Sequence, residues 1–249
     1  SHFLGQNFAK AFDVKYADKN GNLEYVWATS WGVSTRLMGA LIMTHGDDSG
    51  LVLPPNLAPV QIVVVPIFKT ELELNNIKDY LKPHINLIKE KGYTIKIDDR
   101  LNFKPGYKFN EHEIKGVPIR LAVGNRDIEN NSIEVFRRDL LLKENINIEN
   151  LLVKIEFLIK DIQEKLLNKA KAFQLNNTKE VENYNDFKKL IEKGGFVLAH
   201  WDGSEETELK IKNETKATIR CIPESNSKTG TCIISGKKSL KKVYFAKSY

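Results

Sequence analysis

The chain has 249 residues, of which 41% are hydrophobic and 28% are charged, and its formal net charge is +6. These proportions are typical of a soluble globular protein, and no apolar stretch approaches the roughly 20 residues that a membrane-spanning helix needs. The first residues do not have the pattern of a secretory signal. Two cysteines are too few for a disulfide framework, so we expect a reducing, cytoplasmic location. The positive charge favours an acidic partner such as nucleic acid, but only weakly.

Residues 11–32 predict a β-hairpin followed by a strand. Apolar and polar residues alternate on both sides of an Asn20-Gly21 turn, which is a typical hairpin connection. Leucine, methionine and isoleucine then recur at helical spacing over residues 37–42 and predict a buried helix that ends near His45.

Arg36 lies at the turn between this strand and this helix. One interpretation is that it pairs with a carboxylate such as Asp47. The other is that it acts together with Ser34 and Thr35 on a polyphosphate, because hydroxyls, helix N-terminal N–H groups and a guanidinium all suit phosphate oxygens. The turn alone does not decide between the two interpretations.

Between residues 59 and 173, expected strands alternate with expected helices. The strands are expected at 61–65, 93–97, 118–123 and 133–137, and the helices at 72–91 and 150–173. A stretch rich in lysine, proline and glycine before residue 118 predicts a loop. This alternation favours a compact α/β domain with a mostly parallel, mixed sheet.

Residues 174–182 are expected to be a connector to a small α+β unit. Strands of this unit are expected near 196–200, 218–222, 232–234 and 243–246. Its core is expected to consist of six apolar residues, namely Phe196, Val197, Ile219, Ile222, Ile233 and Phe245.

Seven short motifs resemble class II aminoacyl-tRNA synthetases, and within that class the prolyl-tRNA synthetases of the archaeal/eukaryotic type. They are residues 1–8 (SHFLGQNF), 30–36 (SWGVSTR), 45–48 (HGDD), 50–55 (GLVLPP), 105–110 (PGYKFN), 115–120 (KGVPIR) and 247–249 (KSY). The resemblance implies three parts. Residues 1–58 are a remnant of the antiparallel-sheet catalytic domain, 59–173 an α/β anticodon-binding domain with its connecting helix, and 174–249 an α+β C-terminal domain.

The resemblance also implies an activity, namely ATP-dependent activation of proline and its transfer to the 3′ end of tRNA(Pro), with Mg²⁺ assisting in a homodimeric complete enzyme. Arg36 is then a catalytic residue that binds ATP with Ser34 and Thr35. The implied proline pocket is formed by His2, Trp31 and Gly32. The first two class II motifs do not occur in these residues, so we expect this chain alone to be inactive. The alternative is a free-standing, non-catalytic tRNA-binding module.

The implied RNA-binding residues cluster between Arg100 and Arg138. This stretch has eight Lys or Arg against five Asp or Glu, interleaved with aromatic residues, a composition that suits unstacked anticodon bases. Arginine and lysine are natural partners of guanine acceptors, and a carboxylate accepts from guanine amino groups. The candidates are Arg100, Lys108, Phe109, Glu113 and Arg138. A solvated basic loop is the alternative. His112 stands where the family usually has an aromatic residue.

Many members of the family hold zinc in the C-terminal domain through four cysteines. Asp202, Thr207, Cys232 and Ser235 occupy these positions here. One thiolate cannot build a structural zinc site, because hydroxyls are poor ligands at neutral pH. We therefore expect no zinc and a domain held by its apolar core.

Overall fold

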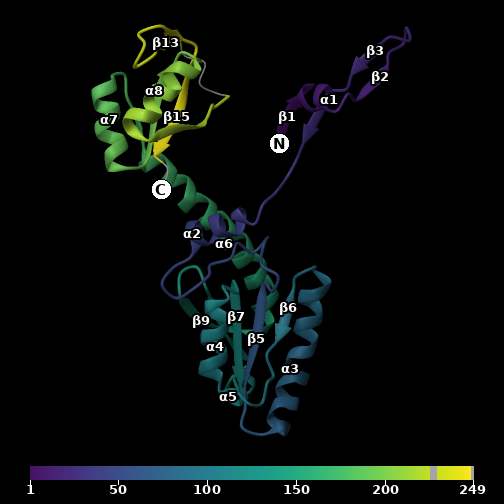
Figure 1. The fold of residues 1–249 in the computed structure, drawn as a ribbon. Coiled ribbons are helices and arrows are strands. Elements are labelled where there is room, and N and C mark those ends of the chain that lie inside the picture. Colours follow the sequence, from purple (N-terminus) through teal and green to yellow (C-terminus); the bar gives the residue numbers. More distant parts are fainter. Residues whose placement is uncertain (225–228, 248–249) are drawn as a thin grey trace. The chain divides into compact units, whose positions relative to one another are not determined.

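The structure, a computed structural model, describes residues 1–224 and 229–247 (Figure 1). The chain divides into two compact units, of which the first contains Ser1–Leu53 and Leu57–Glu149 and the second Pro54–Asn56 and Asn150–Tyr249. Helix α6 (Leu151–Asn176) thus groups with the C-terminal unit, whereas the sequence placed most of it with the preceding domain. Two residues of the last motif, Ser248 and Tyr249, lie outside the described residues. No helix in the described ranges is long and apolar enough to cross a membrane.

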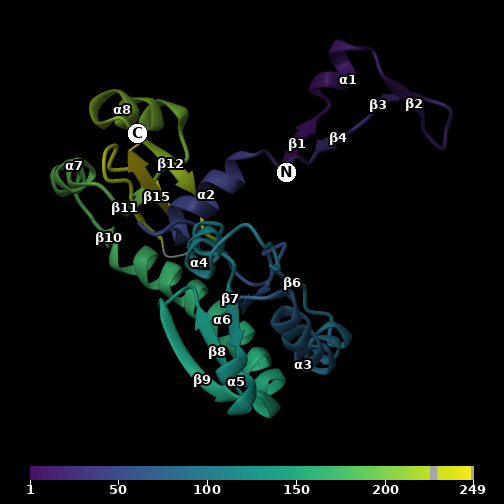
Figure 2. The ribbon, with the colours of Figure 1, turned by 90° about the horizontal axis from the view of Figure 1, so that it is seen from below.

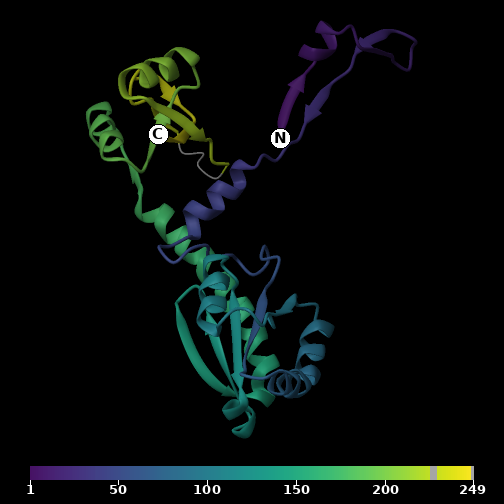
Figure 3. The ribbon, with the colours of Figure 1, turned by 60° about the horizontal axis from the view of Figure 1, so that its bottom comes forward.

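The N-terminal segment contains small paired strands and two helices. Its elements are β1 (His2–Gly5), α1 (Asn7–Ala11), β2 (Lys15–Ala17), β3 (Leu23–Tyr25), β4 (Ala28–Ser30) and α2 (Arg36–His45). Strands β2 and β3 form the predicted hairpin, seen at the purple end of the chain in Figure 3. Gly21 in its turn has a φ of +84°, a conformation that residues with a Cβ rarely adopt. Strand β1 pairs with β4.

A five-stranded mixed sheet forms the centre of the first unit. Its elements are β5 (Ile62–Ile67), α3 (Glu71–Glu90), β6 (Ile95–Ile97), α4 (Pro105–Ile114), β7 (Ile119–Gly124), α5 (Asn125–Glu129), β8 (Ser132–Arg137) and β9 (Leu142–Asn147). The strand order is β6-β5-β7-β8-β9. Strand β5 is parallel to β6 and β7, whereas β8 is antiparallel to β7 and β9, so the sheet is mixed as predicted, with as many antiparallel as parallel pairings.

The buried strand β5 is covered on both faces. Val63 and Val65 cluster with Val117 and with Phe109 of α4, and alternation directs Ile62 and Val64 to the opposite face. These four residues of β5 each have 0% exposure. Helix α3 packs against β5 and β6, and Thr70 caps it by accepting a hydrogen bond from the Glu73 backbone N–H.

The prediction of a loop before β7 is wrong, because residues 105–114 form helix α4. Pro105 occupies its first turn, where a missing N–H costs nothing, so the proline begins the helix instead of breaking it. Helix α5 and strand β9 were also not predicted. Strand β9 is an edge strand with five of six residues exposed, and such a strand has a weak hydrophobic pattern.

The C-terminal unit has a four-stranded sheet in the order β10-β11-β15-β12. Its elements after α6 are β10 (Thr178–Glu180), α7 (Tyr184–Lys193), β11 (Phe196–Trp201), α8 (Glu205–Thr215), β12 (Ala217–Cys221), β13 (Gly230–Thr231), β14 (Lys238–Ser239) and β15 (Lys241–Lys247). Figure 2 shows α7 and α8 beside β11, β12 and β15. Phe187 of α7 and Phe245 of β15 meet edge to face at 5.1 Å in the core.

Three expectations for this unit need correction. The expected connector contains β10, which pairs in parallel with β11. Residues 232–234, expected as a strand, lie in a turn between β13 and β14. Ile222 is 48% exposed and does not belong to the core, whereas Val197 and Phe245 do.

Candidate functional site

Ser34, Thr35 and Arg36 lie at the turn between β4 and α2, where the sequence placed them. All three residues are exposed, and Arg36 is the first residue of the helix. Within the described ranges, the Arg36 guanidinium makes no hydrogen bond or ion pair. A free guanidinium at a helix N-terminus suits an anionic ligand, because the helix dipole also favours negative charge there.

The residues predicted to bind proline lie at one end of the β1–β4 pair. His2 pairs in register with Ser30, directly before Trp31 and Gly32. His2 therefore belongs to a strand. Trp31 is 83% exposed, so its indole is available to form part of a pocket.

Helix α2 and Asp47 differ from the sequence expectations. None of the helix residues is buried, and Leu37, Met38 and Met43 are 61–79% exposed. The carboxylate of Asp47 binds Arg138 through two hydrogen bonds of 2.6 and 2.7 Å and does not bind Arg36. The hydrogen bond from Arg138 holds the pKa of Asp47 below its ordinary value. Arg36 thus has no carboxylate partner from this loop.

The loop that contains Asp47 is fastened to the C-terminal end of α4. The backbone N–H of Leu51 donates to the Ile114 carbonyl at 2.9 Å, and Arg138 Nε donates to the Glu113 carbonyl at 3.0 Å. Gly50 has a φ of +130°, and a Cβ there would lie 2.6 Å from the Ile114 Cα. Only glycine fits so close an approach. The segment after α2 and the helix α4 therefore form one connected structure.

Helix α4 separates the predicted RNA-binding residues onto two faces. Lys108 and His112, one turn apart, are buried on one face, whereas Phe109 and Glu113 are partly buried on another. The helical register therefore sends neighbouring residues Lys108 and Phe109 to different surroundings.

The first face packs around the buried carboxylate of Asp98. Arg100 binds it through two hydrogen bonds of 2.7 Å, and His112 Nε2 lies 2.8 Å from it. Burial by itself raises the pKa of Asp98, but the hydrogen bonds from Arg100 and His112 outweigh burial and hold the pKa far below its ordinary value. Glu111 also binds Arg100, at 2.6 Å. His112 thus has a polar role as a partner of the Asp98 carboxylate.

The second face of α4 contacts a residue that the sequence analysis missed, Arg120 of β7. Its guanidinium carbon lies 3.6 Å from the ring centre of Phe109 and 4.7 Å from that of Phe136. Strand register explains the arrangement, because Arg120 is paired with Val63 of β5 and with Phe136 of β8. A charged residue inside the apolar strand sequence Ile-Arg-Leu-Ala-Val was the signal that could have identified it.

Arg120 is short of hydrogen-bond acceptors. It is 8% exposed, and its Nη2 donates to Glu134 at 3.1 Å. Its Nε is buried without a partner among the described residues. Burial lowers the pKa of Arg120, while Glu134 and Glu113 act in the opposite direction. An arginine between two phenyl rings, with an unused donor and a nearby carboxylate, has the chemistry that recognises a guanine edge.

The five predicted RNA-binding residues therefore differ in accessibility. The side chain of Arg100 is 40% exposed, and Phe109 and Glu113 are partly exposed. Arg138 is 1% exposed and already binds Asp47 and the Glu113 carbonyl, so a direct base contact requires both interactions to be given up. Lys108 is also 1% exposed.

In the C-terminal unit, three of the four positions matched to zinc ligands are joined by hydrogen bonds. Ser235 Oγ and Thr207 Oγ1 each donate to the Asp202 carboxylate at 2.6 Å. Burial by itself raises the pKa of Asp202, but these hydrogen bonds outweigh burial and lower it strongly. This donor set does not fit a structural zinc ion, since two of its members are hydroxyls that already donate to the third. No group of three His, Cys, Asp or Glu side chains suited to a metal occurs in residues 1–224 and 229–247.

Comparisons with known proteins agree with these features. A family model described as anticodon binding domain matches residues 61–158, and one described as prolyl-tRNA synthetase, C-terminal, matches residues 184–249. The whole chain is 55% identical to a proline–tRNA ligase of Porphyromonas gingivalis and 56% identical to one of Cytophaga hutchinsonii. It spans about half the length of these relatives, 51% in each case. The chain therefore belongs to the prolyl-tRNA synthetase family and corresponds to the C-terminal half of its members.

Proposed function

We propose that the complete protein is a cytoplasmic proline–tRNA ligase that activates proline with ATP and transfers it to tRNA(Pro). In this proposal, the present chain supplies the ATP-binding turn at Arg36 and the domain that recognises the anticodon. The observation that carries the proposal is the identity of 53–56% over the whole chain to proteins named proline–tRNA ligase. Mg²⁺ and a homodimeric assembly are expected of the complete enzyme.

Exposed apolar residues in the N-terminal segment support a longer functional protein. Phe3, Phe12, Trp31, Val33 and Met43 are 74–83% exposed. An apolar groove of 680 Å³ also runs along α2 and the residues that follow it. Apolar surface of this extent normally contacts other protein. We propose that the remainder of the catalytic domain covers it, which favours the ligase over a free-standing tRNA-binding module.

Replacing Arg36 by alanine in the complete enzyme is expected to raise the ATP concentration needed for proline activation. A charge-assisted hydrogen bond of this kind contributes about 1.5–3 kcal/mol. The measurement is the ATP dependence of proline-dependent pyrophosphate exchange.

Arg126→Ala is the matched control for this substitution, because Arg126 is an exposed arginine outside the turn. An unchanged ATP dependence in Arg36→Ala contradicts the assignment of the turn.

We further propose that Phe109, Glu113, Arg120 and Phe136 recognise an anticodon guanine. Proline anticodons share two guanines, whose acceptor edge suits arginine and whose amino group suits Glu113. Arg120→Ala is expected to weaken binding of the proline anticodon stem-loop by about 1–3 kcal/mol, because a bidentate contact is lost. Binding by the unmodified protein is expected to fall as salt rises. Filter binding or fluorescence titration at fixed salt measures both effects.

Lys89→Ala is the control, because it removes an exposed charge in the last turn of α3, outside the proposed site. This variant is expected to bind normally. Glu113→Gln tests the same contact with less risk to folding. If the protein binds a loop with both guanines replaced as tightly as the natural loop, the interface is a non-specific basic surface and the proposal is wrong.

A further inference from the structure

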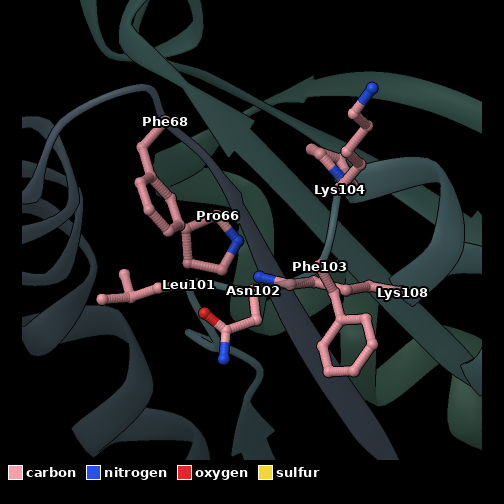
Figure 4. A pocket seen from close by; sticks show the side chains of 8 residues that line it. Pro66, Phe68, Leu101, Asn102, Phe103, Lys104 and Lys108 are labelled. Carbon is pink, nitrogen blue, oxygen red and sulfur yellow. The ribbon is translucent and has the colours of Figure 1, made fainter.

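A cavity lies on the side of α4 opposite to Phe109, at the carboxyl end of β5. It has a volume of about 340 Å³ and is lined mainly by Pro66, Phe68, Leu101, Asn102, Phe103 and Lys108. Figure 4 shows the Lys108 side chain running into the cavity, with its Nζ between Pro66 and Asn102. The same view shows Lys104 pointing away from the cavity. Its lining combines apolar and aromatic side chains with the polar side chains of Asn102 and Lys108, a combination that suits a ligand with both a ring and hydrogen-bonding atoms.

Lys108 has more hydrogen-bond donors than acceptors available to it. Its side chain is 1% exposed, and Nζ donates to the Asp98 carbonyl at 3.0 Å. Among the described residues this is its one hydrogen bond, while the ring of Phe68 lies 5.4 Å from Nζ. An ammonium group carries three donors, so two remain for a ligand in the cavity. A buried charge with unused donors is costly, and a ligand with acceptor atoms removes that cost.

Aromatic rings supply the stacking surface. Phe68 and Phe103 both line the cavity. Phe103 also contacts Tyr107, whose ring centre is 4.7 Å away, and Arg100, whose guanidinium carbon lies 4.7 Å from the Phe103 ring centre. Arg100 is held in turn by the buried carboxylate of Asp98 and by Glu111, so the stack is fixed by ion pairs. A layered arrangement of arginine and aromatic rings is a common platform for an unpaired base.

We propose that this cavity holds one further unpaired base of the bound RNA loop, with an acceptor edge of that base against Lys108 and its ring against Phe103. This inference rests on the proposed function and adds a second base site to it. The two sites are separate, because Lys108 and Phe109 point to different sides of α4. Phe109 contacts Arg120 and the Val63–Val65 cluster, whereas Lys108 contacts Asp98 and Phe68. One helix would then orient two bases of the loop.

The test combines protein variants with RNA loops that lack one base at a time. Lys108→Met keeps the length of the side chain but removes its charge and donors. It is expected to weaken binding of the complete stem-loop by about 10- to 100-fold, as expected for the loss of a hydrogen bond to a charged group. The same variant is expected to show no further loss with the RNA that lacks the base in this cavity. The Arg120→Ala variant is still expected to lose affinity when the base in this cavity is removed. It is expected to lose no further affinity when a different base, the one bound at Arg120, is removed.

Phe103→Leu provides the second variant, because Phe103 lies at the surface and its replacement leaves the buried charges intact. This variant is expected to bind the complete stem-loop more weakly and to show no further loss with the RNA that lacks the base in this cavity. Equal losses with every RNA in both variants, or no loss in either, overturn the second base site. If Arg120→Ala still depends on a guanine in that case, the proposed function stands and only this inference fails. If the unmodified protein binds no anticodon loop, the proposed function itself fails.

Discussion

Replacing Arg138 by alanine is expected to lower the free energy of unfolding of the first unit by about 2–3 kcal/mol. Breaking a buried ion pair from one side costs about 3–5 kcal/mol, and the side chain of Asp47 is 39% exposed, which reduces the effect. The substitution also leaves the Glu113 carbonyl without the Arg138 Nε donor. Urea denaturation monitored by circular dichroism measures the change.

The double variant Asp47→Ala with Arg138→Ala is the control. If the ion pair is the cause, the double variant loses less stability than the sum of the two single variants. The sign of the pH dependence follows from the lowered pKa of Asp47. The pair stabilises the fold above the ordinary pKa of the carboxyl group and loses its effect as the pH falls through the folded-state value. Purely additive losses, or no change in the urea midpoint, contradict this role of Arg138.

The second large effect is expected in the C-terminal unit. Asp202→Ala removes the acceptor of two 2.6 Å hydrogen bonds, from Ser235 and Thr207, and of bonds from the backbone and hydroxyl of Ser204. Each donor left unpaired in a partly buried place costs about 1–3 kcal/mol, and neighbouring donors compensate in part, so we expect a total loss of about 2–4 kcal/mol. Thermal unfolding followed by circular dichroism measures it.

Asp202→Asn keeps the shape and replaces one acceptor by a donor, so it is expected to lose stability at neutral pH as well. Because the pKa of Asp202 is lowered in the fold, its contribution is present above the ordinary carboxyl pKa and disappears as the pH falls. The stability difference between the unmodified protein and each variant should therefore become smaller at strongly acidic pH. Chelators are expected to leave all melting curves unchanged. One zinc per chain by elemental analysis, or a lower melting temperature in chelator, contradicts the prediction that hydrogen bonds to Asp202, and no zinc ion, hold this site together.

The local features of this protein could be predicted from sequence because they depend on neighbouring residues. The Asn20-Gly21 hairpin, the apolar strand β5 and the turn before Arg36 each follow from short patterns, and the structure contains all three. The family resemblance rested on motifs of the same kind. Such patterns work where the backbone conformation and burial of a segment are determined by its own residues.

Tertiary structure alone decided which distant groups meet. The partner of Asp47 lies 91 positions away in the sequence, and no local pattern connects them. Helix α4 was expected as a loop from its composition, yet packing on β5 and a proline in its first turn make it a helix. The strand register places Arg120 between Phe109 and Phe136, and the helical register sends Lys108 to a separate cavity. Long-range pairing of strands, charges and rings thus determined the candidate base sites. These contacts form between elements, so the sequence of any single element does not predict them.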